Sequence, residues 1–397
     1  MAVPSYDRAA LTPAVVHLSV GSFHRSHQAA YFDRLAGQGV TEWVIVGIGL
    51  RHRAMHAALA PQDWLYTVVE RGPHGDRPRI VGAMTGYRFG PDDPEAVVAA
   101  LADGRTRLVT LTVTAAGYEP AAPALPILVD ALARRRHAGL PPFTVLSCDN
   151  LPANGDVARD AVIGLARHRD AGLARWIDEE GAFPSSMVDR ITPTTTDRDR
   201  ERLLRGFGVA DRWPVMTEPY SEWIVEDDFC DGRPPLEDVG VRFVADVRPY
   251  ALIKTRLLNA AHCALGHLGS LAGLDTTDEA MADPLFAEYI ERLTRDEIAP
   301  LLPRVPGLDV EPYRQTVLER LRNPNIADRL ARLCRDGARK VPRHLVPSVE
   351  ERRSRGLAHP LLALAVDGYR WHAERSAPVD VRAAIADALG GAAPLAA

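Results

Sequence analysis

The sequence has few lysines, asparagines and cysteines, and it lacks any long apolar run. Only Lys254 and Lys340 among the 47 basic residues are lysine, and only five residues are asparagine. The four cysteines lie far apart without a CxxC pair, which argues against a disulfide framework or a zinc knuckle. No stretch approaches the roughly 18 apolar residues that a membrane-spanning helix needs. The N-terminal residues lack the apolar segment of a signal peptide.

The overall charge also narrows the function. A formal net charge of −5 gives neither the basic patch of a nucleic-acid-binding protein nor a polybasic membrane anchor. An apolar content of 46% with 25% charged residues is typical of a globular protein, and 397 residues favour two domains. We therefore expect a soluble, cytoplasmic protein of two domains that acts on a small molecule, with no nucleic-acid or membrane partner.

The first half of the chain alternates short apolar runs with helical patterns. The runs that predict buried strands are 15–20, 43–48, 108–114 and 143–147, with helices at 24–35 and 127–137. Strands that alternate with helices in this way favour βαβ units and a mainly parallel, Rossmann-like sheet. Residues 66–87, interrupted at 72–76, are more typical of an antiparallel insertion.

From about residue 249 the pattern is helical. Helical periodicity covers 250–272, 283–298 and 310–321, without a convincing strand. We therefore predict an α/β protein with a Rossmann-like dinucleotide-binding domain at 1–247 and a mostly α-helical substrate and catalytic domain at 248–397. The last ten residues, rich in alanine and glycine, are expected to fray.

The first crossover carries an incomplete cofactor loop. A strand that runs into a glycine and then a helix is where a doubly wound domain binds a dinucleotide pyrophosphate. Only Gly21 of the G-x-G-x-x-G pattern is present, so an ordinary turn is an equal alternative. Arg25 is a candidate phosphate contact or a solvated charge. His24 and His27 have a spacing that could bind a metal, although helix-surface histidines are commoner.

The end of the second strand bears on the choice of cofactor. An NAD site usually places an acid there to bind the ribose hydroxyls. No acid lies between Glu42 and Asp63, and the strand end at Gly49 is followed by Arg51, a histidine and Arg53. This favours a contact to the 2′-phosphate of NADP, with a plain surface loop as the alternative.

The strongest candidate site opens the helical half. At about 100° per residue, Asn259 lies about 140° and His262 about 80° from Lys254, within one broad face. Pro249 suits the first turn of this helix, so Lys254 is expected near its positive end, where the lysine pKa falls. A neutral Lys254 could accept an alcohol proton while Asn259 donates to the oxyanion. The alternative is an amphipathic core helix with an accidental polar seam.

A second candidate lies at residues 147–155, after the last predicted strand. This is the carboxyl edge at which open α/β sheets bind ligands. Asn150 could supply a second oxyanion donor there. Asn154 and Gly155 could equally form only a turn and a cap.

Taken together, the motifs resemble the mannitol dehydrogenase family, the polyol-specific long-chain dehydrogenases/reductases. The resemblance runs from Val16 to about Trp371. It is carried by residues 21–27 (GSFHRSH), 147–155 (SCDNLPANG), 187–193 (MVDRITP), 218–220 (EPY), 226–229 (EDDF), 254–262 (KTRLLNAAH) and 336–342 (DGARKVP). Several long motifs in the family's order make the resemblance specific.

The resemblance implies a metal-independent oxidoreductase that uses NAD or NADP. It implies that Lys254 is the base, that Asn150 and Asn259 form the oxyanion hole, and that His262 orients the substrate. Sugar hydroxyls are expected at Asp189, Arg332 and Lys340. The predicted cofactor contacts are Gly21, Phe23, His24, Arg25, Gly49, Arg51 and Thr114.

Three positions depart from the family. Ser19 replaces the first glycine of the cofactor loop, and Ala115 and Ala251 stand where relatives carry acids. We predict a polyol–ketose dehydrogenase, with mannitol and fructose first and arabinitol or sorbitol next, as a monomer or weak homo-oligomer. One alternative is a fructuronate reductase on the same scaffold. Another, suggested by the three departures, is a cofactor-binding protein with little catalysis. A zinc alcohol dehydrogenase is disfavoured by the cysteine and histidine spacing.

Overall fold

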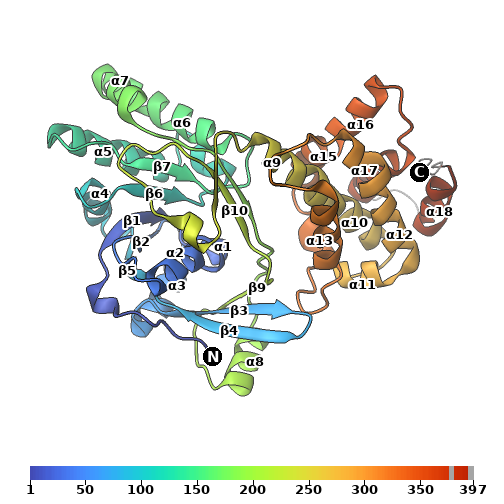
Figure 1. The fold of residues 1–397 in the computed structure, drawn as a ribbon, viewed down its shortest axis with the longest axis horizontal. Helices are drawn as coiled ribbons and strands as arrows, with labels where there is room; N and C mark the ends of the chain where they lie inside the picture. Colours follow the sequence, from blue (N-terminus) through green and yellow to red (C-terminus); the bar gives the residue numbers. More distant parts are fainter. Residues whose placement is uncertain (375–379, 392–397) are drawn as a thin grey trace. The chain divides into compact units, whose positions relative to one another are not determined.

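A computed structural model describes residues 1–374 and 380–391 (Figure 1). The chain divides into two compact units. The first holds residues 1–71 and 75–248, and the second holds 72–74 and 249–397. The predicted boundary at residue 247 lies one residue from this division. The expected fraying concerned residues 388–397, of which 392–397 lie outside the described residues.

The core of the first unit is a five-stranded sheet in which every pairing is parallel. Its strand order is β5-β2-β1-β6-β7. The strands are β1 (Pro13–Leu18), β2 (Val44–Gly49), β5 (Met84–Phe89), β6 (Leu108–Leu111) and β7 (Thr144–Ser147). This is the 3-2-1-4-5 order of a nucleotide-binding domain. The chain adds β2 and β5 on one side of β1 and then β6 and β7 on the other, so the order of strands reverses at β1. The predicted parallel, Rossmann-like sheet is therefore confirmed.

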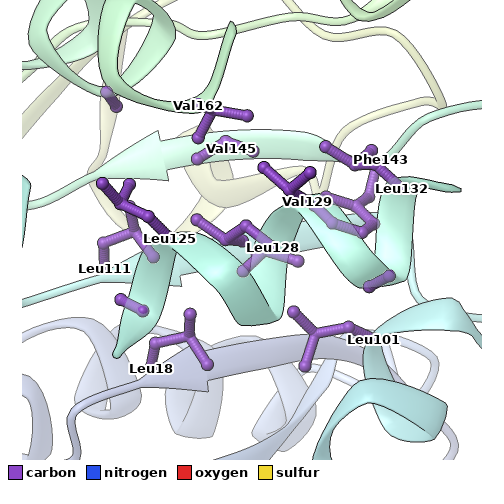
Figure 2. Packing of buried hydrophobic residues seen from close by; sticks show 14 of the residues in the cluster. Leu18, Leu101, Leu111, Leu125, Leu128, Val129, Leu132, Phe143, Val145 and Val162 are labelled. Carbon is purple, nitrogen blue, oxygen red and sulfur yellow. The ribbon is translucent and has the colours of Figure 1, made fainter. Parts of the chain in front are cut away.

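Helices cover the main sheet and close its cores. They are α1 (Ser22–Ser26), α2 (Gln28–Gly37), α3 (Arg53–Leu59), α4 (Pro94–Ala102), α5 (Ala124–His137), α6 (Asn154–Arg169) and α7 (Ala171–Glu180). A further helix, α8 (Asp197–Phe207), packs through Leu203 against Val69 and Met216, outside the main sheet. One core joins the sheet to α4–α7. Figure 2 shows Leu125 of α5 on the side of Leu111 and Leu132 on the side of Phe143, within one cluster of buried side chains that also holds Leu128 and Val145. This apolar packing fixes the carboxyl edge of β1, β6 and β7.

Two smaller sheets complete the first unit. One has the order β4-β3-β9, with β3 (Tyr66–Gly72), β4 (Gly75–Val81) and β9 (Val215–Thr217). The other has the order β11-β10-β8, with β8 (Ser186–Asp189), β10 (Glu222–Glu226) and β11 (Arg242–Val244). The predicted insertion at 66–87 is correct for the hairpin of β3 and β4. It is wrong for β5, because residues 84–89 pair parallel with β2 as an edge strand of the main sheet.

The helix predicted at 24–35 is interrupted. At His27 the backbone turns to φ −109° and ψ −88°, which separates α1 from α2. The side chain of His27 accounts for the break, since its Nε2 bonds to the carbonyl of Glu222 at 2.9 Å in another element. Such a tertiary contact leaves no trace in the local helical pattern.

The second unit is helical, as predicted. Its helices are α9 (Arg248–Lys254), α10 (Ala260–Leu271), α11 (Thr277–Ala282), α12 (Pro284–Arg292), α13 (Val310–Leu321), α14 (Leu330–Cys334), α15 (Gly337–His344), α16 (Val346–Ser354), α17 (Pro360–Glu374) and α18 (Val381–Gly391). Two π-helical segments, η5 (Thr255–Asn259) and η6 (Leu293–Ile298), continue α9 and α12. Within the described ranges, no helix has the length and apolar character required to cross a bilayer.

Candidate active site

The carboxyl ends of β1 and β6 form the edge at which a doubly wound sheet binds its ligand. His17 of β1 ties the two strands together. Its Nδ1 lies 2.8 Å from Thr110 Oγ1, its Nε2 lies 2.9 Å from Thr112 Oγ1, and Thr112 Oγ1 donates to the carbonyl of Ser19. Burial lowers the pKa of His17 to about 3, so the imidazole stays neutral at physiological pH. These hydrogen bonds therefore fix the backbone of Ser19, where the loop after β1 begins.

The loop after β1 has a residue with positive φ at the place of the first glycine of the G-x-G-x-x-G pattern. Ser19 has φ +75°, a region that side chains with a Cβ disfavour. Gly21, the N-cap of α1, has an extended backbone, and a Cβ added to it would meet only the Ser19 carbonyl, at 3.8 Å. Packing among the described residues thus does not require a glycine at 21. Open space in front of it suits the close approach of a pyrophosphate.

Thr114, another predicted cofactor contact, lies in the matching loop after β6. Its φ is +65°, and its side chain is exposed. The buried Asp149 fixes this loop by accepting hydrogen bonds from the backbone N–H of Thr114 at 2.7 Å and from the Tyr118 hydroxyl at 2.7 Å. Burial raises the pKa of Asp149. Two loops with strained backbones thus flank the sheet edge, as is common at functional sites.

The predicted phosphate contact of Arg25 is not supported by its position. The guanidinium is fully buried, stacks at 5.0 Å on the ring of Tyr66 and donates to the carbonyl of Trp213. His24 is also fully buried and stacks on His17 with ring centroids 3.4 Å apart. The side chains of Arg25 and His24 therefore pack beneath the loop in the protein interior and do not reach its surface. Phe23, the other predicted cofactor contact in this helix, is half-buried and stacks on His27.

After β2, Arg51 remains a candidate for contact with the ribose of the cofactor. Arg51 is exposed, whereas the neighbouring Arg53 is held by Asp92 at 2.7 Å. Gly49 is buried, and a Cβ there would lie 2.7 Å from the Tyr87 hydroxyl. The glycine is therefore explained by packing. Contact of Gly49 or Arg51 with a cofactor stays a prediction.

In the motif at 147–155, the last two residues hold the backbone together by packing and hydrogen bonds, whereas Asn150 is exposed. Asn154 forms a two-way pair with the backbone of Ser186, and a Cβ at Gly155 would lie 2.3 Å from the carbonyl of Phe183. These two residues therefore join α6 closely to the start of β8. Asn150, the predicted oxyanion donor, is exposed on the loop after β7. It lies at the carboxyl edge of the sheet, as the prediction requires.

Asp189 is the last residue of β8 and is only 3% exposed. The next residue, Arg190, donates to the carbonyl of Ser26 at 2.5 Å, and the Thr192 hydroxyl bonds to that of Ser26 at 2.9 Å. The motifs at 187–193 and 21–27 are thus physically joined. This linkage explains why both motifs are required to build one sheet edge.

In the second unit, Lys254 ends α9 and is 7% exposed. Its helix begins at Arg248 and continues through η5 and α10 to Leu271. Lys254 is therefore the seventh residue of this helix, beyond the first turn, where the helix dipole is strongest. The expected position of Lys254 near the positive end of the helix is therefore wrong, and the residue lies in a buried part of the helix instead.

The π-helical turn after Lys254 changes the predicted geometry. Its hydrogen bonds join residues five apart, as from the N–H of Ala260 to the carbonyl of Thr255. Asn259 therefore lies about one turn above Lys254, not 140° away. The Nδ2 of Asn259 is buried and has no hydrogen-bond partner among the described residues. Its amide N–H groups are thus available to an oxyanion beside Lys254. His262 follows, half-buried, on α10.

The predicted sugar-binding pair lies on α14 and α15. Arg332 is held by Asp328, whose Oδ1 accepts from its Nε at 2.6 Å. Lys340 donates to the carbonyl of Leu333 at 3.1 Å. Burial lowers the pKa of Lys340, and the positive charge of Arg332 lowers it further. The two cations are therefore close enough to interact, and both are partly accessible.

Sequence reasoning missed His344, which electrostatics groups with these residues. It is 6% exposed, and its Nδ1 has no partner in the part of the chain described. Burial lowers its pKa to about 3, with further contributions from the charges of Arg343, Lys254, Lys340 and His262. A neutral imidazole thus lies near both lysines. Its place two residues after the 336–342 motif was the only available signal.

The chain therefore combines a Rossmann-type domain with a helical domain that carries a buried lysine, the class of two-domain dehydrogenases. Residues 13–238 match the mannitol dehydrogenase Rossmann domain, and residues 246–389 match the mannitol dehydrogenase C-terminal domain. The chain belongs to the mannitol dehydrogenase family. The resemblance seen in the sequence is thereby confirmed.

Similar proteins support this assignment over most of the chain. Mannitol 2-dehydrogenase of Pyrenophora tritici-repentis is 42% identical over 94% of this chain and 70% of its own length. The structure of Pseudomonas fluorescens mannitol 2-dehydrogenase with NAD and D-mannitol has a TM-score of 0.87 at 36% identity, covering 97% and 86% of the two chains. A substrate-free D-sorbitol dehydrogenase has a TM-score of 0.87 at 35% identity, covering 93% and 82%.

Proposed function

We propose that this protein is a nicotinamide-dependent polyol dehydrogenase that interconverts a secondary alcohol and a ketone, with mannitol and fructose as the favoured pair. The observation that carries the proposal is a buried Lys254 followed, one π turn later on the same helix, by Asn259, whose Nδ2 has no hydrogen-bond partner among the described residues. The mannitol 2-dehydrogenases at 42% identity and the structural neighbour with bound mannitol support this substrate class.

The proposed roles follow from side-chain chemistry. Neutral Lys254 accepts the hydroxyl proton, while the amide of Asn259 donates to the oxygen that gains negative charge. The family resemblance gives Asn150 the role of a second oxyanion donor and His262 that of orienting the substrate. Asp189, Arg332 and Lys340 bind the remaining hydroxyls. The nicotinamide cofactor, when bound, accepts the hydride.

The residues present at the sheet edge fit a dinucleotide. The space next to Gly21, where an added Cβ would meet only one atom, and the exposed Thr114 leave room for the pyrophosphate. Phe23 is half-exposed on the helix that follows Gly21. NAD is supported by the structural neighbour with bound NAD. The exposed Arg51, with no acid beside it, supports acceptance of NADP as well. Arg25 and His24 are best assigned to supporting the loop.

A substrate panel tests the proposal. Mannitol, arabinitol, sorbitol, their ketoses and fructuronate are each assayed with NAD(H) and NADP(H) by absorbance of the reduced nicotinamide. We expect the highest kcat/KM on mannitol and fructose. Higher kcat/KM on fructuronate would show the alternative reductase, and cofactor binding without turnover on any substrate would show a protein with little catalysis.

Two variants, Arg51→Ala and Arg53→Ala, test the preference for NADP over NAD in the same assays. Loss of Arg51 is expected to raise KM for NADP at least about tenfold and leave KM for NAD unchanged, because one phosphate ion pair is removed. Arg53 is already paired with Asp92, so its variant serves as the control. Equal effects of Arg51→Ala on both cofactors would contradict the 2′-phosphate contact. A cytoplasmic monomer or weak homo-oligomer stays a prediction.

A further inference from the structure

Three side chains of the second unit that take no part in the proposed reaction come together between helices. They are His267 of α10, Cys334 of α14 and His372 of α17, and their ligand atoms all lie within 4.8 Å of one another. The three residues are far apart in the sequence, so no spacing motif announces them. All three lie on helices, which hold ligands more rigidly than loops do.

The two histidines already face each other. Nδ1 of His267 lies 3.0 Å from Nδ1 of His372. A tetrahedral ion with bonds of about 2.0–2.1 Å to two imidazoles holds its nitrogens about 3.3 Å apart, so this pair needs almost no movement. A thiolate at about 2.3 Å from the same ion lies about 3.5 Å from each nitrogen. Because Sγ of Cys334 lies within 4.8 Å of the imidazole ligand atoms, it needs to move by at most about 1.3 Å to reach that distance.

The protein does not satisfy the ring of His267 by itself. The residue is 1% exposed, and its Nε2 is buried without a hydrogen-bond partner among the residues described. The atom of His267 that faces His372 is Nδ1, so Nε2 carries the ring proton when Nδ1 binds an ion, and the unpaired Nε2 is not itself the ligand. With the proton on Nε2, Nδ1 keeps its lone pair for the ion.

Cys334 provides the third donor. Its Sγ is half-buried and lies 3.6 Å from the Ser270 hydroxyl. The thiolate is the form that binds a metal, and metal binding displaces the thiol proton. One proton is thus released to solvent for each ion bound.

We propose that His267, Cys334 and His372 bind one thiophilic divalent transition-metal ion of the Zn²⁺ type, with the fourth position open to water. Two imidazoles and one thiolate are a ligand set that Zn²⁺ and Co²⁺ both accept, whereas Mg²⁺ and Ca²⁺ require oxygen ligands. The ion has no part in hydride transfer. It joins three helices of the second unit and so stabilises that unit.

The test uses the full-length protein, stripped with a chelator, dialysed and titrated with Co²⁺. We expect one equivalent to produce the near-ultraviolet thiolate-to-cobalt charge-transfer band, which Zn²⁺ then removes. Zn²⁺ should also raise Tm, since it binds only the folded site. Cys334→Ser should abolish the band, and His372→Ala should weaken Co²⁺ binding at least about 100-fold.

Cys230→Ser is the matched control, because Cys230 is a partly buried thiol of the first unit. It should bind Co²⁺ and respond to Zn²⁺ as the wild type does. His372 is half-buried, so its variant is expected to fold even if Cys334→Ser does not, and far-ultraviolet circular dichroism checks both. The proposal is overturned if the wild type shows no band, or if His372→Ala binds as tightly as Cys230→Ser. Neither readout depends on turnover of a polyol.

Discussion

Asp149 fixes the backbone of Thr114 in a left-handed conformation, accepting its N–H at 2.7 Å where φ is +65°. The same carboxylate accepts from the N–H of Val113 at 3.2 Å and from the Tyr118 hydroxyl at 2.7 Å. One buried acid after β7 thus shapes the loop after β6. The predicted cofactor contact of Thr114 depends on a residue that need not touch the cofactor.

Asp149→Asn is therefore expected to destabilise the protein and to weaken cofactor binding. An amide turns an N–H donor toward groups that are themselves donors, so we expect a loss of about 2–3 kcal/mol in the free energy of unfolding. Chemical denaturation and titration of NADH fluorescence measure the two effects. Asp160→Asn, on the exposed side of α6, is the control and should change neither. A stable variant with normal NADH affinity would contradict the role of Asp149.

Ser19→Gly is expected to stabilise the protein. Ser19 has φ +75°, and glycine adopts that region without the steric cost of a Cβ. After subtraction of the greater entropy of glycine in the unfolded chain, we expect a gain of about 0.5–1 kcal/mol. Ser22→Gly, in the first turn of α1, should instead lower stability by about 0.5–1 kcal/mol. If both variants lose stability, strain at residue 19 is not significant.

Lys254→Ala is expected to fold and to lose nearly all turnover. Removal of a general base lowers kcat by about 10²–10⁴-fold. Lys254→Arg should be almost as inactive, because a guanidinium does not release its proton. Arg248→Ala, an exposed cation at the start of the same helix, is the control and should keep full activity. Initial rates of NADH formation with mannitol measure the effect, and near-normal rates in Lys254→Ala would refute the base assignment.

Buried histidines are expected to make the protein sensitive to mild acid. Burial lowers the pKa of His17 to about 3, well below its ordinary value of about 6.5. Above pH 6.5 neither state binds the proton, and as pH falls below 6.5 only the unfolded state does, so stability is lost. At pH 5 this contribution is about 2 kcal/mol.

The free energy of unfolding of wild type and His17→Asn, measured from pH 7 to pH 5, tests this expectation. The variant should lose about 2 kcal/mol less than the wild type over that interval, whatever its stability at pH 7. His137→Asn alters an exposed histidine at the end of α5 and should follow the wild-type curve. Parallel curves for all three proteins would show that His17 does not contribute.

The amino-acid sequence determined the parts of this protein that depend on local pattern. Apolar runs of five to seven residues located four strands of the main sheet, and the change to helical periodicity located the second unit. The motifs identified the family, because they retain their order and spacing along the chain.

Only the tertiary structure decided features that depend on contacts between distant residues. The break at His27 comes from a bond to Glu222, and the burial of Arg25 comes from Tyr66 and Trp213. The π turn that places Asn259 above Lys254 departs from the 100° spacing on which sequence estimates rest.

The cluster of His267, Cys334 and His372 shows the same limit most clearly. Its three residues come from three helices that are separate in the sequence, and only packing brings their ligand atoms within 4.8 Å. Local patterns carry the periodicity of single elements, whereas the chemistry of a site depends on which elements pack together and on which polar atoms that packing leaves unpaired.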